Sequence, residues 1–130
     1  MVSIVVIEDD AAIRDVLRIG LESAGYHVRE AKNGRDGTRE FRKAPTDLVI
    51  TDIYMPDCDG LDVIRRLRRV HPKLKILAIS GASGTMDFLK TARSLGASRV
   101  LYKPFVMTAV LKTVAELLAE GDTVAKAQTS

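Results

Sequence analysis

The sequence predicts one α/β domain organised around a parallel β-sheet. Five short aliphatic runs alternate along the chain with five segments in which apolar residues recur at helical spacing. Three of the runs are almost continuously apolar, which is typical of strands that are buried on both faces of a parallel sheet. A length of 130 residues suits one domain of common size. The alternation within it leads us to expect a doubly wound sheet of five strands and five helices.

Each expected element in the first half of the chain has its own local signal. β-Branched residues favour strands, glycine marks the end of a helix, and proline or Asn-Gly marks a break. The expected order is a strand at Val2–Ile7, a helix with apolar residues from Ala12 to Ala24 that ends at Gly25, a weaker strand at Tyr26–Glu30, a polar helix from Asn33-Gly34 to about Lys43, and a strand at Asp47–Thr51.

The second half repeats the alternation. The expected order is a loop at Met55-Pro56-Asp57, a helix from near Gly60 that ends before His71-Pro72, a strand at Leu74–Ile79, a Ser/Gly loop at 81–84, a helix from Met86 to Leu95 closed by Gly96, a strand at Arg99–Tyr102 and a helix opened by Pro104. From Gly121 the composition turns small and polar, so we expect a folded domain over residues 1–120 and a flexible C-terminal tail over residues 121–130.

Composition and charge limit the class of protein. Hydrophobic residues make up 46% and charged residues 28% of the chain, which excludes wholesale disorder. The apolar runs are too short to span a membrane and no signal peptide is visible, so we expect a cytoplasmic protein. The single Cys58 excludes a disulfide framework. Basic residues crowd the segment from Arg65 to Lys75; because no aromatic residues interleave them, a solvated helix face is favoured over a nucleic-acid contact.

Polar residues follow directly after four of the five predicted strands. They are Glu8, Asp9 and Asp10 after the first strand, Asp52 after the third, Ser80 and Gly81 after the fourth, and Lys103 and Pro104 after the fifth. Ligands of parallel sheets bind beyond the carboxyl ends of the strands, so we expect these side chains to form one site. Two carboxylates about 4 Å apart repel by roughly 4 kcal/mol at an effective dielectric near 20, so the acids need a proton, a lysine or a cation.

This set of side chains favours magnesium. Oxygen-rich sites with one or two close carboxylates and room for water suit Mg²⁺ better than Ca²⁺. His27 and His71 lie elsewhere in this layout, so we expect no zinc site. A hard divalent cation beside an aspartate, together with a lysine and a hydroxyl, is also what phosphoryl transfer to a carboxylate requires. Asp10 has a second interpretation of equal weight, as the N-cap of the first helix.

Four motifs carry a resemblance to a known family. They are VVIEDD at 5–10, TDIYMPDCDG at 51–60, LAISG at 77–81 and YKPF at 102–105. Together they resemble the receiver domain of two-component response regulators, in particular the single-domain chemotaxis regulators, over about residues 2–118. The resemblance implies a flavodoxin-like fold of five βα units with strand order 2-1-3-4-5.

The resemblance also implies a role for each residue of the site. Asp52 looks like the phosphoacceptor, Asp9 like the direct Mg²⁺ ligand, Glu8 like a ligand acting through water, the backbone carbonyl of Tyr54 like a further ligand, Ser80 like the hydroxyl that binds the phosphoryl group, and Lys103 like its ion-pair partner. Asp52 is itself a ligand of the metal, and Mn²⁺ is expected to substitute for Mg²⁺. The Lys103-Pro104 peptide bond resembles one that the family holds cis.

One position departs from the family's pattern. Three residues before the lysine the family often has Tyr or Phe, whereas this chain has Val100 and places an aromatic at Tyr102. We therefore expect the signal to leave through the fourth helix, fifth strand and fifth helix without an aromatic flip.

The function implied is that of a response regulator receiver. It would accept a phosphoryl group from a sensor histidine kinase or a histidine phosphotransfer protein onto Asp52, lose it by hydrolysis, and signal by a change in protein–protein contacts. The domain would catalyse its own phosphorylation and dephosphorylation, so the word enzyme is a matter of definition. We expect a monomer or weak dimer and, since nothing follows the last helix in this sequence, no direct DNA binding.

Two alternatives stay open from the sequence. A degenerate receiver would recognise partners without phosphorylation, but it would not need the complete set of acids, hydroxyl and lysine. A haloacid-dehalogenase-like phosphatase would carry Asp-x-Asp after its first strand, whereas Tyr54 stands two residues after Asp52.

Overall fold

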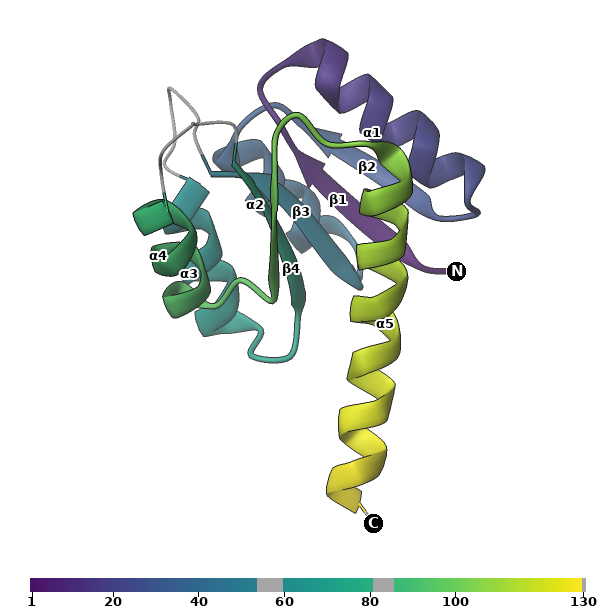
Figure 1. Cartoon of the computed structure of the whole chain (residues 1–130), viewed down its shortest axis with the longest axis vertical. Coiled ribbons are helices and arrows are strands. Elements are labelled where there is room, and N and C mark those ends of the chain that lie inside the picture. Colours follow the sequence, from purple (N-terminus) through teal and green to yellow (C-terminus); the bar gives the residue numbers. More distant parts are fainter. Residues whose placement is uncertain (54–59, 81–85, 130) are drawn as a thin grey trace.

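Strands and helices alternate strictly along the chain (Figure 1). In the computed structural model the described residues are 1–53, 60–80 and 86–129, and for 86–89, 91 and 121–129 only the backbone is described. The strands are β1 (Ser3–Ile7), β2 (His27–Ala31), β3 (Leu48–Asp52), β4 (Lys75–Ser80) and β5 (Arg99–Tyr102). The helices are α1 (Ala11–Ser23), α2 (Gly34–Lys43), α3 (Gly60–Val70), α4 (Met86–Leu95) and α5 (Met107–Thr129).

The five strands form one parallel sheet in the order β2-β1-β3-β4-β5. This confirms the fold class that the alternation predicts. The strand order reverses at β1, from which the chain passes first to β2 and later to β3 on the other side. The carboxyl ends of β1 and β3 are therefore neighbours at the switch point, where open α/β sheets bind their ligands.

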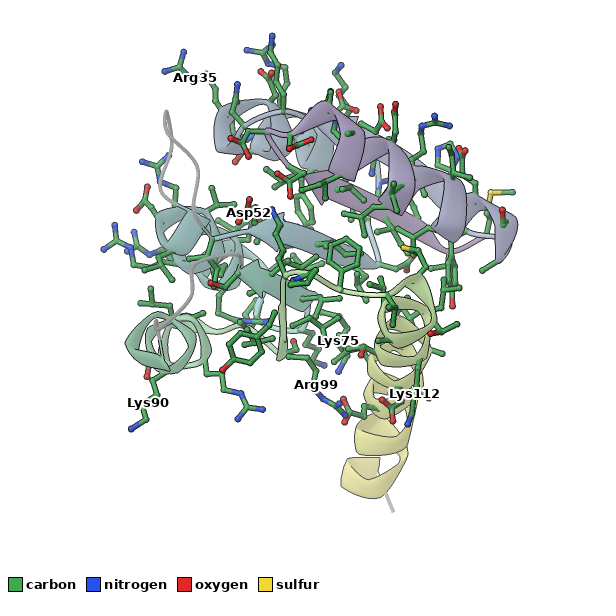
Figure 2. The ribbon with its side chains drawn as sticks, turned by 45° about the horizontal axis from the view of Figure 1, so that its top comes forward. Arg35, Asp52, Lys75, Lys90, Arg99 and Lys112 are labelled. Atoms are coloured by element: carbon green, nitrogen blue, oxygen red, sulfur yellow. The ribbon has the colours of Figure 1, made fainter. Side chains whose placement is uncertain are left out.

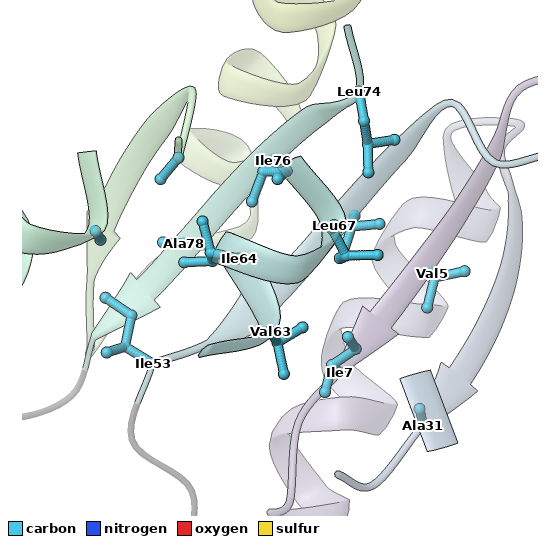
Figure 3. Close-up of a cluster of buried hydrophobic side chains, with 13 residues drawn as sticks. Val5, Ile7, Ala31, Ile53, Val63, Ile64, Leu67, Leu74, Ile76 and Ala78 are labelled. Atoms are coloured by element: carbon cyan, nitrogen blue, oxygen red, sulfur yellow. The ribbon is translucent and has the colours of Figure 1, made fainter. Parts of the chain in front are cut away.

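Helices cover both faces of the sheet. Figure 1 shows α1 and α5 on one face, with α2, α3 and α4 on the other. In β1, Ile4 and Val6 pack in the cluster shared with α1 and α5, whereas Val5 and Ile7 pack in the cluster shared with α3. This alternation follows from the two-residue repeat of a strand. Figure 3 shows the second cluster, where side chains of α3 cover the central strands.

The helix ends follow the predicted caps. The Asp10 carboxylate accepts hydrogen bonds from the backbone N–H groups of Ala12 (2.9 Å) and Ile13 (3.1 Å), so Asp10 is the N-cap of α1. Gly25 and Gly96 follow α1 and α4 with φ of +95° and +125°. These left-handed conformations strain any residue with a Cβ, which explains the glycines at both helix ends.

The last helix differs from the expectation at both ends. It begins at Met107 rather than at Pro104, because the Lys103 N–H still pairs with the Ser80 carbonyl at 2.7 Å and keeps the chain beside β4. It then continues as helix through Thr129, past Gly121, and extends beyond the sheet (Figure 1). Residues 122–129 contain no proline and several good helix formers, which permits this. The domain limit at residue 120 stays a prediction.

Among the described residues, no helix combines the length and the apolar character needed to cross a bilayer.

Candidate functional site

The carboxyl edge of the sheet brings together two buried acids and one lysine. Glu8 and Asp52 are only 1% and 4% exposed. The Lys103 Nζ lies 2.7 Å from Glu8 Oε1 and 2.9 Å from Asp52 Oδ2. One ammonium group thus holds carboxylates from the ends of β1 and β3, and its own residue follows β5.

Asp52 owes its position to the centre of the sheet. It is the last residue of β3, pairs in register with Ile79 of β4, and lies well inside the molecule (Figure 2). Helix α3 begins close behind it, since the Gly60 N–H donates to the Ile53 carbonyl at 3.1 Å. A Cβ added to Gly60 would lie 2.2 Å from the Asp52 carbonyl oxygen, so only glycine permits this approach.

Glu8 is held through its backbone and its side chain. Its N–H donates to the Ala31 carbonyl of β2 at 3.0 Å, and its own carbonyl accepts from Arg14 Nη1 at 2.7 Å. The carboxylate accepts from the Asp10 N–H at 3.0 Å as well as pairing with Lys103. The turn after β1 therefore keeps Glu8 pointed at the centre of the site, while Asp10 faces the helix that it caps.

Lys103 reaches the acids from the far side. Ser80 and Tyr102 pair in register at the ends of β4 and β5, and the next backbone N–H, that of Lys103, bonds to the Ser80 carbonyl. The Lys103-Pro104 peptide bond is cis, as expected. The Lys103 side chain is 18% exposed, so solvent screens its two ion pairs only weakly.

Burial is the main electrostatic influence on the site. It raises the pKa of Glu8 to about 7, against the opposing hydrogen bonds from Lys103 and from the Asp10 backbone, and the neighbouring Asp9 and Asp52 raise it further. Burial also acts to lower the pKa of Lys103, but the pairs with Glu8 and Asp52 together outweigh it, so this pKa lies above its ordinary value. Glu8 is therefore the acid that changes charge near neutral pH.

Three carboxylates are near enough to share a cation. Oxygens of Glu8, Asp9 and Asp52 all lie within 4.8 Å of one another, with Asp9 exposed and the other two buried. All three donors are hard oxygen ligands with solvent access on the Asp9 side, a set that fits Mg²⁺ with several retained waters. Neither His27 nor His71 belongs to this group, which is a statement about the described residues alone.

Ser80 and Tyr54 are the remaining predicted site residues. Ser80 is 2% exposed at the carboxyl end of β4, beside both Asp52 and Lys103 in the sheet. Tyr54, whose carbonyl was expected to bind the metal, lies outside the described residues, as does Cys58.

Two supporting residues were missed by the sequence reasoning. Gly60 permits the approach of α3 to β3, and Arg14 fixes the carbonyl of Glu8. A glycine at the start of a helix behind a strand-end aspartate was the available signal for the first. Nothing local marks Arg14, because its partner is a backbone atom before the helix.

Val100 and Tyr102 differ in environment. Val100 packs against the hydrophobic cluster that includes Ala92 and Ala97, next to α4, whereas Tyr102 is 51% exposed. The two side chains therefore occupy different environments, although residues two apart in a strand lie on the same face of β5.

Comparison with known proteins agrees with this geometry. The family model for the response regulator receiver domain matches residues 4–115. The response regulator receiver protein CpdR of Brucella abortus is 33% identical, over 91% of this chain and 98% of its own length. The chemotaxis protein CheY4 of Vibrio cholerae has a related structure, with a TM-score of 0.84 and 27% identity over 90% of this chain and 98% of its own.

Other relatives are longer. The DNA-binding transcriptional regulator NtrC of Rhizobium meliloti is 37% identical over 91% of this chain, but the match covers only 24% of NtrC. The chain likewise spans about half of the probable transcriptional regulatory protein SilR of Salmonella typhimurium, 52% of its length. The match to the family model, together with the full-length match to CpdR, shows that this chain belongs to the receiver domain family of two-component response regulators.

Proposed function

We propose that this receiver accepts a phosphoryl group on Asp52 and signals through the resulting change in its contacts with other proteins. The observation that carries the proposal is the contact of Lys103 Nζ with both buried carboxylates, at 2.7 Å and 2.9 Å. A lysine poised at the acceptor oxygen, inside a cluster of acids, is the arrangement that a transferred phosphoryl group needs.

The chemistry is the transfer of a phosphoryl group from a phosphohistidine of a sensor kinase or phosphotransfer protein. A carboxylate oxygen of Asp52 forms a bond to phosphorus while the bond from phosphorus to the imidazole nitrogen breaks. The electron pair of the broken bond stays on that nitrogen. Lys103 then pairs with an oxygen of the phosphoryl group, and the Ser80 hydroxyl donates to another. In hydrolysis, water attacks phosphorus, the bond from phosphorus to the Asp52 oxygen breaks, and inorganic phosphate leaves the free carboxylate behind.

Asp9 and Asp52 would bind a magnesium ion directly and Glu8 would bind it through water, with the carbonyl of Tyr54 as the further ligand proposed from the family. The ion would neutralise the negative charge that gathers on the phosphoryl oxygens. This part of the proposal rests on the three carboxylates that lie within 4.8 Å of one another. Mn²⁺, which also prefers oxygen ligands, should substitute.

The partners follow from the family. We propose a histidine kinase or phosphotransfer protein as donor and a protein target that recognises the face formed by α4, β5 and α5, all in the cytoplasm. NtrC is described as a DNA-binding regulator, but this chain matches only 24% of its length. We propose that the receiver itself acts through contacts with other proteins.

The first prediction tests the acceptor. Asp52→Asn should abolish the incorporation of labelled phosphate from a phosphohistidine donor or from acetyl phosphate, because the amide cannot act as the nucleophile. The measurement is the stoichiometry of label per chain in Mg²⁺ buffer, with the circular dichroism spectrum as the check on folding.

Asp10→Asn is the matched control for this experiment. Asp10 stands two residues from Glu8 but caps α1, and asparagine caps a helix as well as aspartate does. This variant should label like the wild type. Unchanged labelling of Asp52→Asn would disprove the assignment, and absence of labelling in the wild type would favour the degenerate receiver instead.

A further inference from the structure

A basic cleft lies between α2 and α3, apart from the acidic site. Its volume is about 1060 Å³, and its lining includes five cations and one large apolar side chain: Lys32, Arg35, Arg39, Arg42, Arg66 and Val63. One carboxylate, that of Asp36, also lines it. None of Glu8, Asp52 and Lys103 belongs to the lining, so the cleft is a separate feature of the fold.

Most of this positive charge is not neutralised. Arg39 lies 3.9 Å from Asp36, and Arg66 lies 3.0 Å from Asp62, which also pairs with Arg65. Within the part of the chain that the structure describes, no carboxylate lies within 4 Å of a cationic nitrogen of Lys32, Arg35 or Arg42. Like charges gathered in one concavity repel one another and create a positive potential there.

The spacing of three arginines on α2 places their guanidinium groups on the same side of the helix. Arg35, Arg39 and Arg42 recur at intervals of four and three residues, which places them on one face of the helix. The outer two lie about 10 Å apart along the helix axis, given the rise of 1.5 Å per residue. Figure 2 shows Arg35 projecting outward from its helix. Arginine outnumbers lysine here, and its planar fork matches phosphate oxygens in pairs.

The shape and lining distinguish between classes of anionic partner. The apolar centre that protein–protein interfaces usually have is lacking, since Val63 is the one large apolar side chain among the described lining residues. Single-stranded nucleic acids are bound on stacked aromatic rings, and none lines this cleft within the described residues. A concave space of this volume suits a small molecule.

We infer that the cleft between α2 and α3 binds a small, multiply phosphorylated anion. The terminal phosphates contact Arg35 and Arg42, Arg39 lies between them, Arg66 approaches from α3, and Lys32 approaches from the turn before α2. This binding requires neither Mg²⁺ nor phosphorylation of Asp52, so it stands or falls independently of the proposed function.

The test uses inorganic tripolyphosphate as the probe, titrated calorimetrically into the full chain in metal-free buffer at low salt. We expect one site per chain, with an affinity that falls as salt is raised. The double variant Arg35→Gln/Arg42→Gln should bind roughly tenfold more weakly or worse, because each charge-assisted hydrogen bond contributes more than a neutral one. Both residues are exposed, and neither has an ion pair with another described residue, so the variant should melt at the same temperature as the wild type.

The control removes the same charge elsewhere. Arg69→Gln/Lys112→Gln takes two exposed cations from outside the cleft and should leave the affinity within about twofold of the wild type. Asp52→Asn should also bind the probe normally.

Three results would overturn the inference. The first is equal weakening in the two double variants, which would mean a diffuse effect of net charge. The second is no binding at millimolar probe. The third is tighter binding of a single-stranded oligonucleotide or a polyglutamate peptide than of tripolyphosphate.

Discussion

At the residue scale, the site depends on one partly buried cation shared by two buried acids. Lys103 is the counter-ion of both Glu8 and Asp52, and Asp9 adds a third negative charge at the exposed edge. Since removing the cation would leave two carboxylates uncompensated, Lys103 matters for stability as well as for the proposed chemistry. The pKa of Glu8 is unusual, because burial raises it from 4.5 to about 7.

The second prediction concerns the pH dependence that Glu8 confers. An acid whose pKa is higher in the folded than in the unfolded chain binds more protons when folded, so the free energy of unfolding falls as pH rises from about 4.5 to about 7. The full effect is about 3–4 kcal/mol at most, at 1.36 kcal/mol per pKa unit. Glu8→Gln should remove this fall, as measured by urea unfolding in metal-free buffer at several pH values.

Glu22→Gln serves as the control, because Glu22 is an exposed acid of α1 that pairs with Arg18. Its pH profile should follow the wild type. The raised pKa of Lys103 affects the free energy of unfolding in a different pH range. The stability that it contributes is complete below pH 10.5 and is lost only above it. A Glu8→Gln variant with the wild-type slope between pH 5 and 7 would contradict the assignment.

The third prediction concerns Gly60. In Gly60→Ala the new methyl group would meet backbone atoms, 2.2 Å from the Asp52 carbonyl oxygen and 2.6 Å from the Ile53 Cα, so α3 or the end of β3 must shift. We expect a loss of about 1–3 kcal/mol in unfolding free energy, typical of overpacking, together with slower phosphorylation of Asp52. Urea unfolding and the labelling rate measure the two effects.

Gly25→Ala separates the two effects. Its φ of +95° strains alanine, but nothing lies within 4 Å of the added Cβ and the residue is remote from the site. This variant should lose stability by about 1 kcal/mol and keep the wild-type labelling rate. If both variants label at the wild-type rate, the approach of α3 does not position Asp52.

At the element scale, β5 connects the site with the surface proposed for output. Its last residue precedes Lys103, and Val100 packs beside α4 while Tyr102 stays half exposed. The basic segment from Arg65 to Lys75, which covers the second half of α3 and the turn before β4, also makes a structural contact. The Arg68 guanidinium donates to the carbonyls of Gly96 (2.7 Å) and Pro72 (2.6 Å), which ties α3 to the end of α4. The expected solvated face thus holds one structural arginine.

The fourth prediction concerns the path of the signal. Phosphorylation adds negative charge and acceptor oxygens at Asp52, which should draw Ser80 and Lys103 towards them. Val100 is small and stiff at χ1, so it cannot fill the space left by Ser80 as an aromatic ring would. With beryllofluoride and Mg²⁺ as the phosphoryl mimic, we expect large amide shifts at residues 81–87 and an unchanged Tyr102 ring, measured by NMR.

The Asp52→Asn variant should show none of these shifts under the same conditions. Movement of the Tyr102 ring from solvent into the core would refute the idea that the signal passes without an aromatic flip.

At the scale of the whole molecule, the edge of the sheet concentrates negative charge while the chain as a whole carries +3. The fold tolerates the acids because Lys103 offsets two of them. The third carboxylate, that of Asp9, has an oxygen within 4.8 Å of both and repels them when all three are ionised. A cation bound only by the folded chain would relieve this repulsion and stabilise the protein.

The fifth prediction measures that linkage. Mg²⁺ at about a hundred times its dissociation constant should raise the free energy of unfolding by about 2.7 kcal/mol. Asp9→Asn should weaken the effect and leave the metal-free protein equally or more stable, because the exposed carboxylate has no cation within 4 Å among the described residues. Thermal unfolding with and without Mg²⁺ tests both statements.

Asp15→Asn provides the control, since this exposed acid of α1 lies outside the acidic cluster. It should respond to Mg²⁺ like the wild type. A metal-free Asp9→Asn variant that melts below the wild type would contradict the repulsion.

The alternation of strands and helices, and the edge of the sheet at which Glu8, Asp52, Ser80 and Lys103 gather, can be predicted from the sequence. These features follow from local periodicity and from the rule that parallel strands present their carboxyl ends on one side. The sequence also marked both possible roles of Asp10, of which the capping role is the one observed. Such properties depend on residues close in the chain, so a single sequence contains them.

Which of these groups are in contact, and what surrounds them, depends on how distant elements pack together. The double contact of Lys103, the raised pKa of Glu8, the close approach at Gly60 and the cleft that gathers Lys32 with Arg66 all join residues from different elements. The start of α5 at Met107 likewise depends on a hydrogen bond to β4. Distances between elements and the burial of each charge are set by packing of the whole sheet and its helices, which no local pattern encodes.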